Sequence, residues 1–322
     1  EQERVRLEQI GQGCVEFGQL SLKLFEDIVL KNKQYVAMIK SEDFTHRTYS
    51  MGLVDEHNRS NFYDGKVRVV DPDGKEFIKY GPNEYLEHIA ERVEPWTYLK
   101  FPYLKNVGWK GFVDGKDSGI YRATPLSRCN AADGLATPLA QQHYERFYDA
   151  MGGKPVHATL ATHWARLIEL LNAGERALEL ARDPEITSTN IRTIPTATPD
   201  EGVGIVEAPR GTLTHHYITD ERGLLRKVNL VVGTTNNHAP ICMSVQKAAE
   251  GVIKPGKPVT QGLLNQVEMA FRAYDPCFGC ATHAMPGQMP LTINLHDADG
   301  NLITVLSRDE NGRVSTRRAE EL

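Results

Sequence analysis

Nine residues near the C-terminus of this 322-residue chain constrain it more than any other stretch, and they run D-P-C-F-G-C-A-T-H from Asp275 to His283. They place two thiols and an imidazole within one short segment. The two residues between Cys277 and Cys280 allow both sulfurs to face one ion, and thiolates select soft or borderline transition metals. The segment therefore predicts a metal site.

Two other interpretations of a Cys-x-x-Cys pair suit this chain less well. A structural zinc site needs a second ligand pair, and Cys14, Cys129 and Cys242 are isolated in the sequence. A thioredoxin-like redox pair opens a helix that follows a strand. Here a run of helical periodicity, Leu263 to Tyr274, precedes the pair and is ended by Pro276. We therefore expect the two cysteines on a turn after a helix.

Composition and charge narrow the class of protein. With 40% hydrophobic residues, the chain can bury a large core. Its 37 basic and 42 acidic residues give a net charge of -5, which provides no electrostatic footprint for nucleic acid. The sequence shows no apolar run of roughly 18 residues, no secretion signal and no even set of cysteines for a disulfide framework. We expect a cytoplasmic protein without a membrane span.

Two long segments have the periodicity of helices. From about Val5 to Leu30, apolar residues recur at steps of three and four. The segment from Val156 to Arg182 is rich in Ala, Leu and Glu and stops before Pro184. A shorter helix is predicted from Tyr85 to Arg92. The apolar stripe of the first helix consists of Ile10, Cys14, Phe17, Leu20, Leu24, Phe25 and Ile28.

Three segments are predicted to form β-hairpins because β-prone runs flank turn sequences. They span Gly65 to Tyr80 around D-P-D-G, Thr212 to Val232 around D-E-R-G, and Leu291 to Leu306 around D-A-D-G. The stretch from Pro95 to Gly119, rich in proline, glycine and aromatic residues, is predicted to be a long ordered loop. A charged tail follows the third hairpin. The sequence thus predicts an α+β fold that is mainly helical, with small antiparallel hairpins.

The string D-P-C-x-x-C-A-x-H resembles the distal metal-binding motif of [NiFe] hydrogenase large subunits. Four further stretches resemble the same family, so the resemblance covers nearly the whole chain. It is nearest to the soluble multimeric members that reduce a nicotinamide, reduce a deazaflavin or feed a heterodisulfide reductase, and it leaves these three acceptors open. The four stretches are Gly119-Ile120-Tyr121-Arg122, Thr137-Pro138-Leu139-Ala140, Glu207-Ala208-Pro209-Arg210-Gly211 and Thr234-Thr235-Asn236-Asn237.

The resemblance implies a helical bundle decorated by hairpins and a nickel–iron centre whose iron carries carbon monoxide and cyanide. In the family, four cysteines from two motifs hold the nickel. Cys277 would then be a terminal nickel ligand and Cys280 a bridging one. His283 would help to hold a magnesium or iron ion beside the centre.

The resemblance also assigns roles to side chains that do not bind metal. Arg210 matches the arginine above the position where dihydrogen is split, and Pro209 matches the proline beside a cyanide ligand. Thr234 matches a hydroxyl donor to cyanide. Asp275 matches the carboxylate that orients the arginine. Read alone, Arg210 would be a surface arginine in a turn, Thr234 a strand-end threonine and Asp275 a helix-terminal capping or turn residue.

The remaining cysteines and one histidine pair are expected to be structural. Cys14, Cys129 and Cys242 are interpreted as small buried hydrophobes. His215 and His216 alternate along a predicted strand, so their rings point to opposite faces and cannot both bind one ion.

The family's other cysteine motif, R-x-C-x-x-C, occurs nowhere in this sequence. The resemblance places it upstream of the helix that begins near Val5. We therefore expect an N-terminally truncated large subunit, inactive alone, whose domain spans 1–283. Residues 284–322 would be a pro-segment of the precursor, which a maturation protease removes after His283 once insertion factors have loaded nickel.

The function that the resemblance implies is the reversible oxidation of dihydrogen to protons and electrons. The chain has no cysteine spacing for an iron–sulfur cluster of its own, so electrons would leave through an iron–sulfur small subunit, together with further redox subunits. Two alternatives stay open: a non-catalytic scaffold or assembly subunit of a redox complex, and a structural zinc protein. Nickel content separates the enzyme from both.

Overall fold

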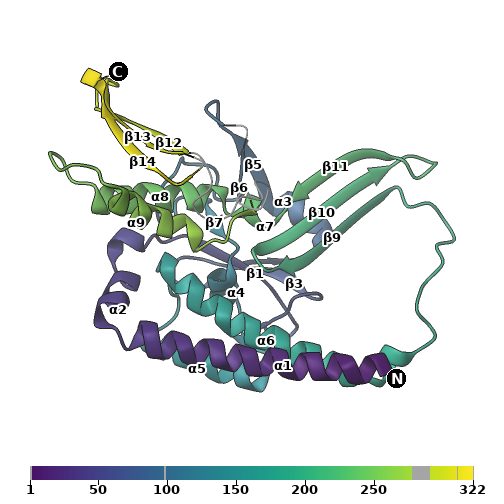
Figure 1. Ribbon diagram of the computed structural model, residues 1–322. Helices are drawn as coiled ribbons and strands as arrows, with labels where there is room; N and C mark the ends of the chain where they lie inside the picture. The colour runs from purple at the N-terminus through teal and green to yellow at the C-terminus, as the bar shows by residue number, and fades with distance from the viewer. Residues whose placement is uncertain (1, 98, 278–290, 310, 322) are drawn as a thin grey trace. The chain divides into compact units, whose positions relative to one another are not determined.

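The computed structural model describes residues 2–97, 99–277, 291–309 and 311–321, which form two compact units, Glu1–Asp275 and Pro276–Leu322 (Figure 1). The α-helices are α1 Gln2–Phe25, α2 Lys33–Ile39, α3 Tyr85–His88, α4 Pro125–Ala131, α5 Pro138–Met151, α6 Thr162–Arg182, α7 Gly233–Asn236, α8 His238–Val252 and α9 Gln261–Arg272. The strands are β1 Tyr49–Val54, β2 Arg59–Ser60, β3 Lys66–Val70, β4 Glu76–Tyr80, β5 Ile89–Val93, β6 Lys100–Leu104, β7 Tyr121–Arg122, β8 Gly134–Leu135, β9 Glu201–Ala208, β10 Gly211–Thr219, β11 Leu225–Val231, β12 Leu291–His296, β13 Leu302–Arg308 and β14 Val314–Arg318. The predicted α+β class is confirmed.

The helices α1 and α6 pack side by side through small residues. The buried face of α1 consists of Gly11, Val15, Gly18 and Leu22, at alternating steps of four and three residues. A Cβ atom on Gly18 would lie 3.1 Å from the Cα of Leu171. The glycines therefore allow the two helix backbones to approach closely.

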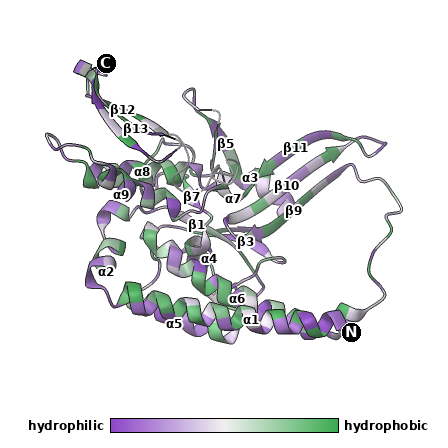
Figure 2. Cartoon of the chain, viewed as in Figure 1, coloured by the Kyte–Doolittle hydropathy of each residue, from purple (hydrophilic) through white to green (hydrophobic). Residues whose placement is uncertain are grey.

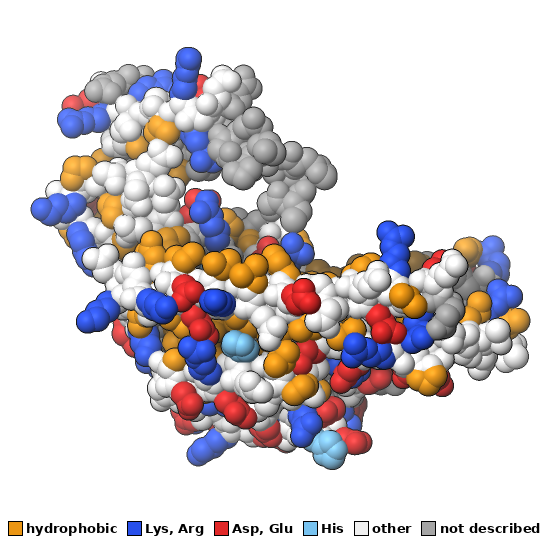
Figure 3. All heavy atoms as spheres, turned by 60° about the horizontal axis from the view of Figure 1, so that its bottom comes forward, with side chains coloured by type: hydrophobic (Ala, Val, Ile, Leu, Met, Phe, Trp, Pro, Cys, Tyr) orange, Lys and Arg blue, Asp and Glu red, His pale blue; other side chains and the backbone are white. Residues whose placement is uncertain are grey.

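The apolar stripe that the sequence predicted for the first helix is largely exposed in the first unit. The helix itself is confirmed, but it buries its glycine face, because only glycine permits this close packing on α6. Cys14 is exposed, so its interpretation as a buried hydrophobe was wrong. Hydrophobic and hydrophilic residues alternate along α1 (Figure 2), and hydrophobic side chains reach the surface on this side of the molecule (Figure 3). The apolar side chains of this stripe that are at least 48% exposed are Ile10, Phe17, Leu20, Leu24 and Ile28.

Replacing Gly11 with valine is expected to lower the free energy of unfolding by about 1–3 kcal/mol, the usual cost of overpacking. A Cβ atom there would lie 3.0 Å from the backbone Cα of Leu178, so a whole helix must move. Gly13→Val is the matched control, since nothing lies within 4 Å of a Cβ at Gly13 on the same helix. The shift in urea denaturation midpoint measures both. Equal midpoints for the two variants would contradict the close packing.

The largest sheet in the described part of the chain has six strands. Its strands run in the order β4-β3-β1-β2-β8, with β7 paired in parallel to β1. The predicted hairpin from Gly65 to Tyr80 is confirmed as β3 and β4. The short helix α4 packs on β1 so closely that a Cβ on Gly52 would lie 2.9 Å from the Cα of Arg128. Thr124 caps α4 by accepting a hydrogen bond from the Ser127 amide.

The second predicted hairpin, β10 and β11, is confirmed, but it belongs to a three-stranded sheet in the order β11-β10-β9. Strand β9 was not predicted, because Gly202 and Gly204 weaken its β-propensity. In this sheet His215 bonds to Tyr217 while His216 bonds to Tyr85, so the two imidazoles have separate partners.

The prediction of a helix from Tyr85 to Arg92 was wrong beyond its first turn. Only α3 is helical, and the chain then enters β5, which pairs antiparallel with β6. The predicted loop from Pro95 to Gly119 therefore contains a strand. Pairing with a partner strand outweighs the local helix propensity of these residues.

The second unit contains the third predicted hairpin, β12 and β13, and the further strand β14 in the segment predicted to be a tail. No helix in the described part of the chain is long and apolar enough to cross a membrane.

Candidate functional site

The turn between β9 and β10 carries two of the predicted site residues, Pro209 and Arg210. Gly211 makes this turn possible, because a Cβ atom on it would lie 2.2 Å from the carbonyl oxygen of Ala123 and 2.8 Å from that of Gly233. The turn therefore lies tightly between the end of β7 and the start of α7. Any side chain at Gly211 would push Arg210 out of place.

The guanidinium of Arg128 stabilises this turn by hydrogen bonds to its carbonyl oxygens. It donates to the carbonyl oxygen of Ala208 at 2.9 Å and to that of Pro209 at 3.2 Å. It also pairs with the Glu169 carboxylate at 2.6 and 2.5 Å and with Glu207 at 2.9 Å. Arg128 lies on α4, Glu169 on α6 and Glu207 at the end of β9. One buried side chain thus joins three elements to the site.

Burial and charge act against each other in this cluster. Burial favours the neutral form of Arg128, but Glu169 and Glu207 outweigh it and raise the pKa of the guanidinium. Burial also raises the pKa of Glu207, against the lowering effect of Arg128 and of hydrogen bonds from the Leu53 amide and Thr212. The three side chains are at most 8% exposed. The cluster is stable only as a complete set.

The side-chain amide of Asn237 connects the turn to the next candidate. Its Nδ2 donates to the carbonyl oxygens of Ala123 at 3.1 Å, Arg210 at 3.2 Å and Gly233 at 3.0 Å. Its Oδ1 accepts from the amide of Ala123 at 2.9 Å. Gly233 directly precedes Thr234, which is 7% exposed at the start of α7. Asn237 therefore connects the turn of Arg210 to the start of α7, where Thr234 lies.

The structure brings Arg210 and Asp275 together. The Nε of Arg210 donates to the carbonyl oxygen of Asp275 at 2.7 Å and lies 3.2 Å from its carboxylate Oδ2. Asp275 follows α9 and has φ +49°, a left-handed conformation that aspartate tolerates better than most residues. Both side chains are partly exposed, at 31% and 46%. The pair forms a salt bridge at the surface of the first unit.

A buried network fixes the residue before Asp275. The hydroxyl of Tyr274 lies 2.8 Å from the Ser244 hydroxyl and 3.1 Å from Nε2 of His46. Burial, reinforced by the charge of Arg122, keeps the pKa of His46 well below its ordinary value, so its ring is neutral at pH 7. This network anchors the end of α9 and thereby the backbone carbonyl that Arg210 binds.

The predicted metal ligands directly follow Asp275 and Pro276 in the sequence. Cys277 is exposed and belongs to the second unit. Cys280 and His283 lie outside the described residues. Within the described ranges, no group of three His, Cys, Asp or Glu side chains could hold a metal ion. An exposed thiol is nevertheless the kind of group that, as a thiolate, binds a soft metal.

Three side chains that build the site, Arg128, Glu169 and Asn237, were not predicted from the sequence. Asn237 lies in a stretch that resembles the hydrogenase family, and Glu207 begins another, but no role was assigned to either. Arg128 carries no signal in the sequence, because a charged residue in a short segment is usually exposed. Cys129 beside it is buried, as predicted, and burial raises the pKa of its thiol.

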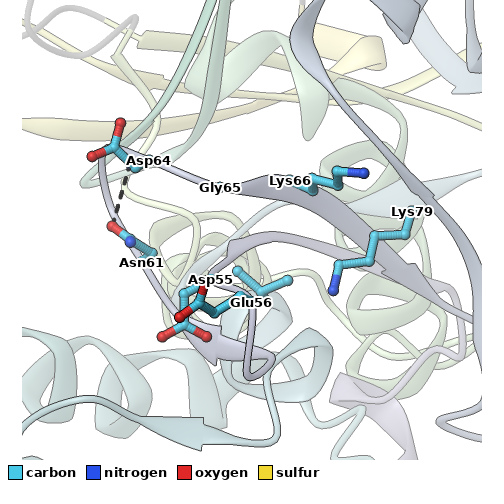
Figure 4. A pocket seen from close by; sticks show the side chains of 8 residues that line it. Asp55, Glu56, Asn61, Asp64, Gly65, Lys66 and Lys79 are labelled. Carbon is cyan, nitrogen blue, oxygen red and sulfur yellow. Dashed lines mark hydrogen bonds between the residues drawn. The ribbon is translucent and has the colours of Figure 1, made fainter.

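A surface pocket elsewhere on the first unit shares no residue with this site. Acidic and lysine side chains line it together, and Asn61 accepts a hydrogen bond from the Asp64 amide within it (Figure 4). None of the predicted site residues contributes to it.

The chain matches the family model of nickel-dependent hydrogenases over residues 18–283. It belongs to this family, as the sequence resemblance indicated. It is 46% identical over 306 residues to an iron-sulfur subunit of the F420-non-reducing hydrogenase of Archaeoglobus profundus, in a match that covers 95% of this chain and 63% of that protein. It is 40% identical to the NAD-reducing hydrogenase HoxS subunit beta of Cupriavidus necator, covering 91% of this chain and 58% of that protein.

Solved structures agree with the sequence comparisons. The crystal structure of an NAD+-reducing [NiFe]-hydrogenase in the H2-reduced state superposes with a TM-score of 0.78 at 35% identity, covering 88% of this chain and 60% of that one. The chain thus spans about 60% of the length of the relatives that it matches. The predicted hydrogenase large-subunit fold is confirmed.

Proposed function

We propose that this chain forms part of the large subunit of a [NiFe] hydrogenase, which converts dihydrogen reversibly into protons and electrons. One observation supports this above the others: Arg210 is fixed in its turn and bound to Asp275, two residues before Cys277. Membership of the nickel-dependent hydrogenase family supports the choice of metal.

Cys277 and Cys280 would bind nickel as thiolates, and His283 would bind a magnesium or iron ion nearby. The nickel–iron centre, with carbon monoxide and cyanide on its iron, would supply the Lewis acidity that cleaves dihydrogen. Pro209 and Thr234 would line the pocket for the iron's ligands.

Arg210 and Asp275 act on the space beside the metal. The guanidinium presents its positively charged donors in a fixed plane. The Asp275 carboxylate and carbonyl orient that plane from one edge. A fixed positive group stabilises negative charge that develops during the reaction without needing to reorganise. Arg210 would therefore lower the barrier, while Asp275 holds it in place.

Electrons would leave through an iron–sulfur small subunit, together with further redox subunits, in the cytoplasm. The relatives' names identify them as single subunits of larger hydrogenases. Removal of residues 284–322 by a maturation protease, after nickel-insertion factors have acted, would complete the site. Nickel-loaded, active enzyme that still ends at Leu322 would contradict this maturation step.

Metal analysis tests the proposed function directly. The complex that co-purifies with this tagged chain under anaerobic conditions should contain nickel and iron and reduce a viologen dye with dihydrogen. Nickel K-edge absorption should show sulfur ligands. Zinc in place of nickel would make the chain a structural zinc protein. A complex without nickel or zinc would make it a scaffold.

A further inference from the structure

Three consecutive carbonyl oxygens of the Arg210 turn each accept a hydrogen bond from a buried side chain. Those of Ala208 and Pro209 accept from Arg128, and that of Arg210 accepts from Asn237. A turn exposed to solvent does not need such support, since water can satisfy its carbonyls. The carbonyl of Arg210 itself depends on Asn237.

We infer that Asn237 is a positioning residue for Arg210. Its amide is 1% exposed and spans the gap between the end of β7, the Arg210 turn and the start of α7. The Nδ2 group fixes Arg210 from its backbone side, and Asp275 fixes the guanidinium from the other end. The same amide holds the carbonyl of Gly233, one residue before Thr234. One side chain thereby sets the position of the Arg210 turn relative to the start of α7, where Thr234 lies.

The neighbouring residue Asn236 provides an internal comparison. Asn236 is 3% exposed, and its side-chain amide makes three hydrogen bonds: Nδ2 donates to the carbonyls of Thr212 at 2.6 Å and Val232 at 3.1 Å, and Oδ1 accepts from Tyr121 at 2.6 Å. None of these bonds reaches Arg210 or Gly233. The two asparagines are thus alike in burial, with four side-chain hydrogen bonds for Asn237 and three for Asn236, but they differ in their link to the candidate site.

Asn237→Ala should make Arg210 more reactive towards phenylglyoxal, an arginine-selective dicarbonyl. The side chain of Arg210 is 31% exposed and pairs with Asp275. We expect the loss of the Asn237 bond to loosen the turn and, with it, this pair. We expect the rate of Arg210 modification, followed by mass spectrometry of its peptide, to rise about five-fold, a change that one lost hydrogen bond to a carbonyl allows. In Asn236→Ala, the rate of Arg210 modification should stay within about two-fold of the rate in the protein of native sequence.

Asn237→Asp serves as a second variant if the alanine variant does not fold. It keeps the shape and the acceptor for the Ala123 amide, but it replaces the Nδ2 donor with a carboxylate oxygen that faces three carbonyls. It should raise the Arg210 rate at least as much. An unchanged Arg210 rate in folded Asn237 variants, or an equal rise in Asn236→Ala, overturns the inference.

A catalytic consequence of this positioning rests on the proposed function, and the two can fail separately. In the co-purified complex, Asn237→Ala should lower kcat for dihydrogen while nickel content stays unchanged. If the native complex carries no nickel, the proposed function is wrong and the Arg210 rates still test the role of Asn237. If the complex is active but Asn237 variants leave the Arg210 rate unchanged, only the positioning role is wrong.

Discussion

Arg210→Lys should lower the rate of dihydrogen oxidation by about 10²–10³-fold, the usual cost of removing one fixed donor from a preorganised site. Lysine keeps the positive charge but loses Nε, the atom that bonds to the Asp275 carbonyl at 2.7 Å. An ammonium on a flexible stem cannot hold a planar set of donors in one direction. Dye reduction by the nickel-loaded complex measures the loss.

The nickel content of this variant should remain that of the native complex, because Arg210 is not among the expected sulfur ligands. Arg226→Lys is the matched control. Arg226 lies on β11 of the same sheet, with 66% of its side chain exposed, and pairs with Asp220 at 3.2 Å. Its replacement should change the rate less than about two-fold, since exposed pairs contribute little. A native rate in Arg210→Lys, with nickel present, would remove Arg210 from the mechanism.

The sequence predicted the elements that depend on local chemistry. The three hairpins follow from turn strings such as D-P-D-G. In such a string, aspartate bonds to the turn backbone and glycine adopts the positive φ that the turn needs, independently of the surrounding structure. The helix before Asp275 follows from its periodicity and from Pro276 beyond its end. These signals need no knowledge of distant residues. The structure therefore confirms them with small changes at their ends.

The wrong predictions concern segments whose structure depends on contacts with residues far away in the sequence. Ile89 to Val93 form a strand because Lys100 to Leu104 pair with them, and the local sequence favours a helix instead. The first helix buries Gly11 and Gly18 because α6 approaches them closely, whereas periodicity indicated the larger apolar residues. Neither choice can be made without knowing which element lies opposite.

The candidate site divides in the same way. A motif can be compared with a family residue by residue, so Arg210, Asp275 and Thr234 could be predicted as site residues. The side chains that hold them were not predicted. Arg128 is 41 residues from Glu169 and 79 from Glu207, and only the folded chain brings the three together. Cys280 and His283 lie outside the described residues, so their roles stay predictions.

Arg128→Met should lower the free energy of unfolding by about 3–5 kcal/mol, because it leaves buried charge without a partner. Methionine fills a similar volume but cannot pair with Glu169, which is 8% exposed, or with Glu207, which is 1% exposed. The carbonyls of Ala208 and Pro209 also lose their donor. The shift in urea denaturation midpoint measures the loss.

Arg68→Met is the matched control for burial. Arg68 is also largely buried and binds two carboxylates, but Glu76 and Asp133 are 45% and 55% exposed, so water can hydrate them once the arginine is gone. Pairs with exposed partners contribute about 0–1 kcal/mol, and the lost bond to the Ala131 carbonyl adds about 1 kcal/mol. The loss of stability in Arg68→Met should therefore be smaller than that in Arg128→Met. Adding Glu169→Gln to Arg128→Met should recover part of the stability, because a neutral amide costs less to bury than an unpaired carboxylate.

Equal losses in both arginine variants, with no recovery from Glu169→Gln, would mean that Arg128 acts through packing alone. The site turn would then owe its position to Asn237 and Gly211.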